Sequence, residues 1–379
     1  MSSLRLLVSG GGTGGHIYPA LAITEAVRRA RPGTEVLYLG TREGLEASIV
    51  PQAGLRFEAI PSRGMVGKGP LRAPGAIWAA LQGLLAARRI IRRFRPDVVV
   101  GTGGYVSGPV GLAAFLGRVP LVIHEQNVFP GVTNRWVSRW AVAVAVPFAD
   151  ARRYFPRSAK VVVTGNPVRA TVTEMTPAAG RRVLGLPDEG LVVYLVGGSR
   201  GARVFNEAIA RAMPGWLSRP GLRAVFATGE RYFEETRQAL ASAGIVPSDG
   251  GKITLVPYLH RADAALAAAD VVVTRAGGTT LAEVTARGLP AVIVPSPNVT
   301  HNHQDYNARV LGRAGAAVVI REAELTGEVL ERAVSEILAS PALREEMRRA
   351  SLALGRSGAA EEIARLVLAA AESAPGRRK

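Results

Sequence analysis

Short apolar runs alternate along the chain with stretches in which apolar residues recur at helical spacing. After the first run, Ala20, Ile23 and Val27 fall on one face of a helix. The strand-like runs of the first half lie at residues 4–9, 36–39, 98–100 and 121–123. The helix-like stretches between them include about 75–94 and 108–117. Strands that alternate with helices predict a parallel, doubly wound sheet.

The same pattern restarts in the second half of the chain. A run at 191–196 leads through a glycine turn into a helical stretch at 202–213. In addition, Asp97-Val-Val-Val-Gly-Thr-Gly-Gly is echoed about 170 residues later by Asp270-Val-Val-Val-Thr-Arg-Ala-Gly-Gly. We therefore predict an α/β protein with two doubly wound, Rossmann-like domains that face each other across a cleft.

Turn residues suggest where one domain ends and the next begins. Gly165-Asn166-Pro167 interrupts a strand-like run, which predicts domains at 1–165 and 166–340. Residues 341–379 are helical in composition, and we expect these C-terminal helices to pack back on the N-terminal domain, with a frayed tail at 375–379.

Length and composition exclude several classes of protein. The chain of 379 residues exceeds what a single core usually holds, so two domains fit its size. It has no cysteine, which excludes disulfides, thiolate metal sites and a cysteine nucleophile. No apolar stretch of transmembrane length and no signal peptide is visible, so we expect neither.

The positive charge is concentrated in the first half. Residues 1–166 hold 21 Lys and Arg against 8 Asp and Glu, a net +13, whereas residues 167–379 hold 26 against 22, a net +4. This asymmetry indicates an anionic partner, either nucleic acid, anionic lipid or a phosphorylated substrate. A general preference for arginine explains it equally well, since only four of the 47 basic residues are lysine.

A glycine-rich turn follows the first strand. Gly10, Gly12 and Gly15 match the spacing of a dinucleotide-binding fingerprint, in which backbone N–H groups at a helix start bind phosphate. An NAD site also needs an acidic residue at the end of the second strand, where this chain has Thr41-Arg42 and then Glu43. The NAD interpretation is weakened accordingly, and a packing turn is the remaining alternative.

Three more turns of this kind occur, at Gly103–Gly108, Gly197–Ser199 and Ala276–Thr280. Four such turns at strand ends predict a ligand with several anionic or polar groups. Glu283 follows the last turn, where a carboxylate could accept both hydroxyls of a ribose or simply complement the helix dipole. His16 begins the first helix and is the best candidate for a general base, with support of the turn as the alternative.

The sequence gives little indication of a metal site. His301 and His303 are close together, but only Asp305 is an acidic neighbour, and the chain has no Asp-x-Asp pair. We therefore expect no metal and no cofactor. Backbone N–H groups and helix ends would then have to stabilise the negative charge of any bound diphosphate.

Taken together, these motifs resemble the MurG family of N-acetylglucosaminyl transferases of peptidoglycan synthesis. The resemblance spans residues 5 to about 316 and is carried by motifs in a fixed order. The motifs are Ser9-Gly-Gly-Gly-Thr-Gly-Gly-His16, Gly103-Gly-Tyr-Val-Ser-Gly108, His124-Glu-Gln-Asn127 with Pro130-Gly131 and Asn134, Gly165-Asn-Pro-Val-Arg169, Gly197-Gly-Ser199, Arg275–Glu283 and Gln304-x-x-Asn307.

The resemblance implies a GT-B fold and an inverting transfer without a covalent sugar intermediate. GlcNAc would move from UDP-GlcNAc to the 4-hydroxyl of MurNAc in undecaprenyl-diphospho-MurNAc-pentapeptide, the step from lipid I to lipid II. The first domain would hold the lipid acceptor and the second the nucleotide sugar. The enzyme would work peripherally at the cytoplasmic face of the cell membrane, and other cell-wall synthesis proteins are candidate partners.

The resemblance also assigns donor-binding positions. Arg169 and Ser199 match donor contacts, Leu259 a uracil-facing backbone position, and Gln304 a sugar contact. The remaining positions are Thr13, Gly14, Gly15 and Asn127 in the first domain, and Gly278, Thr279, Thr280, Leu281, Ala282 and Glu283 in the second. Arg200 stands where the family commonly has Gln, and His303 stands where some members have a second Gln, so their roles stay open.

Parts of the sequence also fit other functions. The fold also suits a UDP-GlcNAc epimerase or a transferase to another lipid, and a nucleic-acid-binding protein would use the +17 net charge. The motifs Gly103–Gly108 and His124–Asn127 argue against the first two. Nucleic acid is not expected as a partner, because the basic residues are not interleaved with aromatic ones, which make up only 6% of the chain.

One basic, amphipathic stretch at 77–95 predicts attachment to an anionic membrane surface. Ile77, Leu81, Leu84 and Ile91 form a stripe expected to pack on the sheet. The residues expected to face the membrane are Trp78, Leu85, Arg88, Arg89, Arg92 and Arg93. An ordinary covering helix with a solvated, charged end is the alternative.

Overall fold

The computed structural model describes residues 3–63, 73–198, 201–248 and 251–373, and the side chains of 73–77 are not among what it describes. The chain divides into two compact units, which we describe separately. Unit 1 comprises residues 1–167 and 357–379, and unit 2 comprises residues 168–356. The chain therefore passes from one unit to the other twice.

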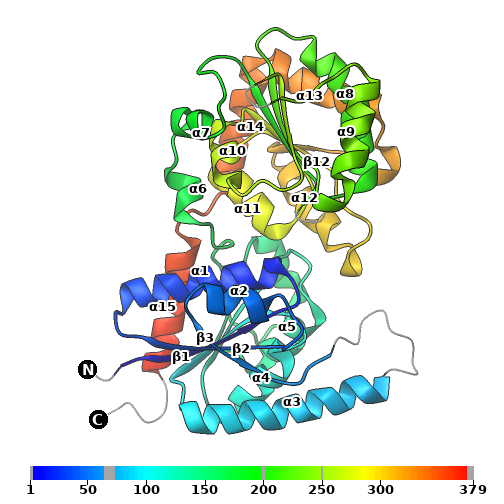
Figure 1. Ribbon diagram of the computed structural model, residues 1–379. Coiled ribbons are helices and arrows are strands. Elements are labelled where there is room, and N and C mark those ends of the chain that lie inside the picture. Colours follow the sequence, from blue (N-terminus) through cyan, green and yellow to red (C-terminus); the bar gives the residue numbers. More distant parts are fainter. Residues whose placement is uncertain (1–2, 64–72, 199–200, 249–250, 374–379) are drawn as a thin grey trace. The chain divides into compact units, whose positions relative to one another are not determined.

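Unit 1 is built on a parallel sheet of seven strands in the order β3-β2-β1-β4-β5-β6-β7 (Figure 1). The order reverses between β1 and β4, so the chain segments that follow these two strands diverge to opposite faces of the sheet. The strands are β1 (Arg5–Gly10), β2 (Glu35–Gly40), β3 (Arg56–Ala59), β4 (Val98–Gly103), β5 (Leu121–His124), β6 (Ala143–Val146) and β7 (Val161–Val163).

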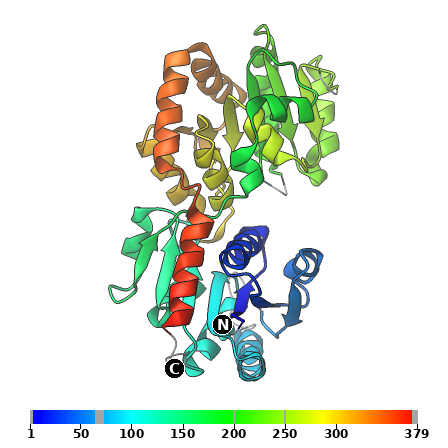
Figure 2. The same cartoon turned by 90° about the vertical axis from the view of Figure 1, so that its left-hand side faces the viewer.

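Helices cover both faces of this sheet. One apolar cluster joins the sheet to α1 (Gly14–Ala30), α2 (Glu46–Gln52) and α15 (Ala359–Glu372). A second cluster joins the opposite face to α3 (Ala73–Phe94), α4 (Ser107–Leu116) and α5 (Val132–Val137). Figure 2 shows α15, in red, running alongside the sheet, where it packs on α1.

Unit 2 repeats the plan with six parallel strands in the order β10-β9-β8-β11-β12-β13. Here the order reverses between β8 and β11, and the turns that follow these strands contain two of the predicted glycine motifs. The strands are β8 (Val192–Val196), β9 (Arg223–Ala227), β10 (Ile253–Val256), β11 (Val271–Thr274), β12 (Ala291–Ile293) and β13 (Ala317–Val319).

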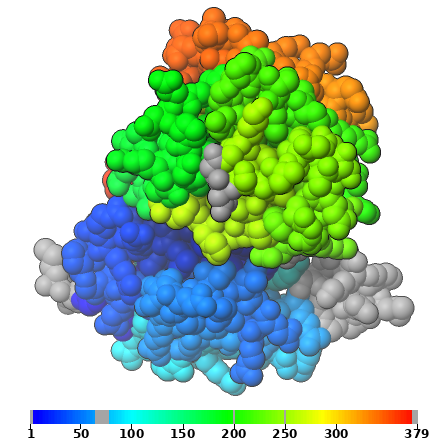
Figure 3. All heavy atoms as spheres, turned by 45° about the horizontal axis from the view of Figure 1, so that its top comes forward, coloured from blue at the N-terminus to red at the C-terminus, as the bar shows by residue number. Residues whose placement is uncertain are grey.

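The helices of unit 2 also lie on both faces of its sheet. The main apolar cluster joins the sheet to α8 (Arg203–Leu217), α9 (Phe233–Ser242), α13 (Gly327–Ala339) and α14 (Pro341–Leu354). In Figure 3, green residues from the first half of this unit make up most of its visible surface. The other helices are α6 (Ala170–Glu174), α7 (Pro177–Val183), α10 (Ala262–Ala268), α11 (Gly278–Ala286) and α12 (His303–Arg313).

The expected fold class is confirmed, since both units are doubly wound parallel sheets of the Rossmann type. The prediction for the C-terminal helices is wrong for α14. The side chain of Ser340 accepts a hydrogen bond from Leu343 N–H, and Pro341 starts the helix, so α14 follows α13 directly and packs on α13 and α11 in unit 2. Only α15, after the break around Gly355, packs in unit 1.

The structure also corrects the predicted face of α3. Leu81 was expected to pack on the sheet but is 49% exposed, beside Trp78 at 63% and Leu85 at 57%. The buried face instead contains small residues such as Gly83, where an added Cβ would lie 2.2 Å from the carbonyl oxygen of Pro61. Ile91 is buried as expected, and the side chain of Ile77 lies outside the described residues.

Candidate active site

Two of the predicted glycine turns meet in unit 1. The turn after β1 and the turn after β4 are joined by a hydrogen bond from Gly11 N–H to the carbonyl oxygen of Gly103, at 3.3 Å. A Cβ on Gly104 would lie 2.3 Å from the carbonyl oxygen of Gly11, so the two backbones approach more closely than any side chain would permit. The turns are thus one structural element, built from segments about 90 residues apart.

His16 lies in the first turn of α1, beside this element. Its Nδ1 lies 2.9 Å from the carbonyl oxygen of Gly11 and 3.3 Å from the hydroxyl of Thr13. A carbonyl oxygen can only accept, so Nδ1 carries the proton that it donates there. In the neutral ring the lone pair is then on Nε2, which gives a half-buried side chain the form that a general base requires.

The start of α1 also offers backbone donors. Thr13 and Gly15 are exposed and Gly14 is half-buried, and the first turn of the helix contains no acidic residue. The first N–H groups of a helix have no partner within it and point toward its positive end. Thr13, Gly14 and Gly15 are therefore placed where an anionic or hydroxyl-bearing ligand could bind.

Asn127 is held in the loop after β5 by the carboxylate of Glu125. The Oε1 atom accepts the backbone N–H groups of Gln126 and Asn127, each at 2.9 Å, and the side-chain amide of Asn127 at 3.3 Å. The Oε2 atom accepts from Gly131 N–H at 3.0 Å and from the Asn134 amide at 2.9 Å. Glu125 thus shapes the whole loop, a role that its place in the sequence motif did not reveal.

His124, in contrast to His16, is fully buried at the end of β5. Burial lowers the pKa of His124 to about 3, so the ring is neutral at physiological pH. The side-chain amide of Gln126 donates to the carbonyl oxygen of Thr102 at 2.8 Å and faces Nδ1 of His124 at 3.0 Å. His124 therefore supports the loop and has no access to solvent.

In unit 2, Glu283 is the central charged group of the predicted donor positions. It is the sixth residue of α11, beyond the first turn, so its charge is not placed to complement the helix dipole. Burial raises the pKa of Glu283, and the Arg169 guanidinium, which donates to its Oε1 at 3.1 Å, counteracts that rise. Tyr194 and Asp263 are its other titratable neighbours.

The remaining positions around α11 differ in what they offer. Thr279, Thr280 and Ala282 are half-buried, as is Leu259 in the loop after β10. Leu281 is fully buried, and its N–H donates to the carbonyl oxygen of Gly277 at 2.9 Å, so it supports the helix. Ser199 and Arg200 lie outside the described residues.

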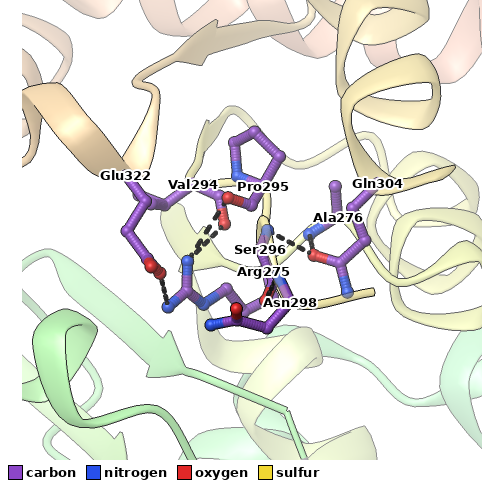
Figure 4. Close-up of polar contacts among 8 residues, drawn as sticks. All are labelled: Arg275, Ala276, Val294, Pro295, Ser296, Asn298, Gln304 and Glu322. Atoms are coloured by element: carbon purple, nitrogen blue, oxygen red, sulfur yellow. Dashed lines mark hydrogen bonds and ion pairs between the residues drawn. The ribbon is translucent and has the colours of Figure 1, made fainter. Parts of the chain in front are cut away.

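Gln304, on α12, bridges two turns of unit 2 (Figure 4). Its Oε1 accepts the backbone N–H groups of Ser296 at 2.8 Å and Ala276 at 3.2 Å. The carbonyl end of the amide is thereby used within the protein, and the NH2 end is the one that a ligand could meet.

Arg275, a buried residue, stabilises the same two turns. It is only 6% exposed, donates to the carbonyl oxygen of Val294 at 3.1 Å and forms an ion pair with Glu322 (Figure 4). Its guanidinium also lies over the Phe205 ring, 5.3 Å from the centroid. The sequence motif contained Arg275, but its ion-pair partner Glu322 is 47 residues further along the chain, so the motif did not indicate the pair.

Neither a metal cluster nor a membrane span is found in the part of the chain that the structure describes. Across residues 3–63, 73–198, 201–248 and 251–373, no three His, Asp or Glu side chains come together to hold a metal ion. Within the same ranges, no helix is both long and apolar enough to cross a membrane. The Nδ1 atom of His303 faces the carbonyl oxygen of Thr300 at 2.9 Å.

Two Rossmann-type units, each with glycine turns and polar groups after its central strands, are the architecture of the GT-B fold. Comparison with known families makes this specific. Residues 6–146 match the glycosyltransferase family 28 N-terminal domain, and residues 192–364 match the family 28 C-terminal domain. The chain belongs to glycosyltransferase family 28, and the resemblance found in its motifs is confirmed.

Individual relatives are similar to this chain over nearly its full length. A UDP-N-acetylglucosamine--N-acetylmuramyl-(pentapeptide) pyrophosphoryl-undecaprenol N-acetylglucosamine transferase of Symbiobacterium thermophilum is 49% identical over 366 residues, which cover 96% of each chain. The enzyme of that name from Moorella thermoacetica is 46% identical, over 98% of this chain and all of the relative. The crystal structure of Acinetobacter baumannii MurG has a TM-score of 0.78 at 30% identity, covering 97% of this chain and 99% of that one.

Proposed function

We propose that the protein transfers GlcNAc from UDP-GlcNAc to the 4-hydroxyl of MurNAc in undecaprenyl-diphospho-MurNAc-pentapeptide. The bond between the sugar's C1 and the diphosphate breaks, a bond from C1 to the acceptor oxygen forms with inversion, and UDP leaves. The proton of the acceptor hydroxyl passes to a base. The observation that carries the proposal is the 49% identity to a transferase of this name across both units.

Unit 1 is the acceptor half of the enzyme in this proposal, and His16 is its base. The hydrogen bond from Nδ1 to Gly11 supports this role, because it leaves the lone pair on Nε2 for the acceptor's proton. Thr13, Gly14, Gly15 and Asn127 then border the reacting sugar.

Unit 2 is the donor half. Glu283 accepts the ribose hydroxyls through Oε2, since Arg169 occupies Oε1. The N-terminal turn of α11, from Gly278 onward, lies beside the phosphates, and the NH2 group of Gln304 donates to a sugar hydroxyl. Backbone N–H groups of the protein stabilise the negative charge of the diphosphate, and the proposed reaction uses no metal or cofactor.

The acceptor is a membrane lipid, and α3 is the segment proposed to bind the membrane surface. Trp78, Leu81 and Leu85 form an exposed apolar stripe along the helix. Further along the same face lie the exposed cations Arg89 and Arg92. Arg88 is half-buried, while Arg93 forms an ion pair with Glu58 and so contributes less free charge. The protein would act peripherally at the cytoplasmic face of the cell membrane.

A transfer assay tests the proposed function directly. The full chain is mixed with UDP-GlcNAc and a short-chain MurNAc-pentapeptide diphospholipid, and UDP and the lipid-linked disaccharide are quantified. Both products should form in equal amounts, and EDTA should leave the rate largely unchanged. Conversion of UDP-GlcNAc into its C2 epimer without the acceptor would favour an epimerase. Restoration by Mg²⁺ of a rate lost to EDTA would contradict charge neutralisation by the protein alone.

Replacement of Glu283 by alanine should weaken UDP-GlcNAc binding by about 10–150-fold, because hydrogen bonds to a charged group contribute roughly 1.5–3 kcal/mol. The ionised carboxylate is the form that accepts hydroxyls. Since burial raises the pKa of Glu283 above its usual range, affinity should be full at high pH and fall as the pH drops through that pKa.

Calorimetric titration of UDP-GlcNAc across pH measures both effects. The Glu283→Ala variant should lack the acidic decline, and Glu189→Ala, which removes an exposed carboxylate of the same unit, should bind like the wild type. An unchanged affinity in Glu283→Ala would remove Glu283 from the donor site.

A further inference from the structure

Glu46, at the start of α2, is a buried carboxylate to which the reaction outlined above gives no task. Its side chain is fully inaccessible to solvent, although α2 itself lies at the surface beside α1, as Figure 3 shows in two shades of blue. Burial alone would raise the pKa of Glu46, but hydrogen bonds from Gly12 and Thr41 lower it below its usual range. The group is therefore a buried anion, stabilised by hydrogen-bond donors.

Its hydrogen bonds tie the glycine turn to the end of β2. The Oε2 atom accepts Gly12 N–H at 3.0 Å, and Oε1 accepts the backbone N–H of Thr41 at 2.9 Å and its hydroxyl at 2.7 Å. Gly12 has φ +85° and lies on the surface of the turn, so this bond fixes a residue that is otherwise poorly constrained. The Gly12 N–H is also directed at the protein's own carboxylate, which makes it unavailable to a phosphate.

The surrounding backbone is shaped to accommodate this carboxylate. A Cβ on Gly11 would lie 2.3 Å from Oε1 of Glu46, and a Cβ on Gly44 would lie 2.2 Å from Oε2. A Cβ on Gly40 would come within 2.5 Å of the Cγ of Glu46. Gly11 in the turn after β1, Gly40 at the end of β2 and Gly44 in the loop after β2 thus leave room for one side chain.

Gly11 connects this carboxylate to the candidate base. One side of Gly11 packs against Glu46, and its carbonyl oxygen accepts the Nδ1 proton of His16 at 2.9 Å. We propose that Glu46 is a positioning residue that holds the Gly11–Gly12 backbone so that His16 keeps its Nδ1 proton and presents Nε2 to the acceptor. This inference rests on the proposed function for the identity of the reaction, but the orientation of His16 can be measured without it.

The first test is Glu46→Gln, which keeps the shape of the side chain. An amide has only one acceptor oxygen, so its NH2 group must face a buried N–H or hydroxyl donor and the turn must shift. We expect kcat to fall about 10–100-fold, as small misplacements of a catalytic group do, with the KM for UDP-GlcNAc within about twofold. The Glu43→Gln variant, which changes an exposed carboxylate of the same loop, should be close to wild type.

A double-mutant cycle separates positioning from a general structural role. If Glu46 acts through His16, Glu46→Gln should cost little further activity in the His16→Ala background. An equal loss in both backgrounds, or no loss in either, would overturn the proposal. Should Glu46→Gln fail to fold, Gly44→Ala serves instead, because its methyl group would displace the carboxylate without removing its charge.

The orientation of His16 gives a readout that does not depend on turnover. Nitrogen-15 NMR of the imidazole should show one neutral tautomer, protonated at Nδ1, in the wild type and a mixture in Glu46→Gln. The same single tautomer in both proteins would refute the positioning role. A wild-type protein that shows the expected tautomer but forms no disaccharide would instead contradict the proposed function.

Discussion

Replacement of His16 by alanine is expected to lower kcat by about 10²–10⁴-fold, the usual contribution of a general base. The Nε2 atom is the basic site of the ring, because Nδ1 is committed to the carbonyl oxygen of Gly11. Single-turnover measurements with UDP-GlcNAc bound in advance would report the chemical step. UDP-GlcNAc affinity, measured separately, should be little changed.

The matched control for this prediction is His16→Asn. An asparagine amide can replace the Nδ1 proton in the hydrogen bond to Gly11, but it cannot take a proton from the acceptor. If His16 acts as the base, the His16→Asn variant should be as inactive as the His16→Ala variant. Recovery of activity by Asn would show that the hydrogen bond to the turn is what matters, and the base would have to be sought elsewhere.

Reversal of Arg88, Arg89, Arg92 and Arg93 to glutamate is expected to reduce binding to anionic vesicles by at least about 100-fold. Each arginine near an anionic surface contributes about 1 kcal/mol, and a glutamate in its place adds repulsion. Arg89 and Arg92 are exposed and contribute most, whereas Arg88 is half-buried and Arg93 is paired with Glu58. Sedimentation with vesicles containing phosphatidylglycerol measures the change, and high salt should weaken the wild type in the same way.

The control variant reverses Arg28, Arg29, Arg152 and Arg153, four exposed arginines elsewhere in unit 1. It alters the net charge by the same amount but leaves α3 intact, so its vesicle binding should remain well above that of the α3 variant. Both variants should turn over a water-soluble acceptor analogue at the wild-type rate. Equal losses of vesicle binding would mean that net charge, and not α3, determines attachment.

The apolar pattern predicted the doubly wound sheets because central parallel strands are buried on both faces and stand out as continuous apolar runs. It did not reveal β3 (Arg56–Ala59), whose sequence is half polar and which lies at the edge of its sheet. It also gave the wrong face for part of α3. There the small residue Gly83 allows a close approach to Pro61, and the large apolar residue Leu81 is left outside.

The glycine turns and His16 could be predicted because local spacing carries their chemistry. Glu46 could not, since its partner Gly12 is 34 residues away and only the fold brings the two together. The sequence directed attention to Glu43 in the same loop, which is exposed. Gly40 and Gly44, which both precede Glu46, were the available signal, because neither has a Cβ to obstruct the inward path of the Glu46 side chain.

The double passage of the chain between the units bears on how the protein is made. Part of the core of unit 1 comes from α15: Ala360, Ile363, Ala364, Val367, Ala370 and Ala371. A ribosome therefore releases the sheet of unit 1 and all of unit 2 before it supplies the helix that covers α1. Unit 2, whose residues are contiguous, can finish folding first, so the domain that emerges first from the exit tunnel is completed last. During that interval the uncovered apolar surface of α1 would be a natural binding site for a chaperone.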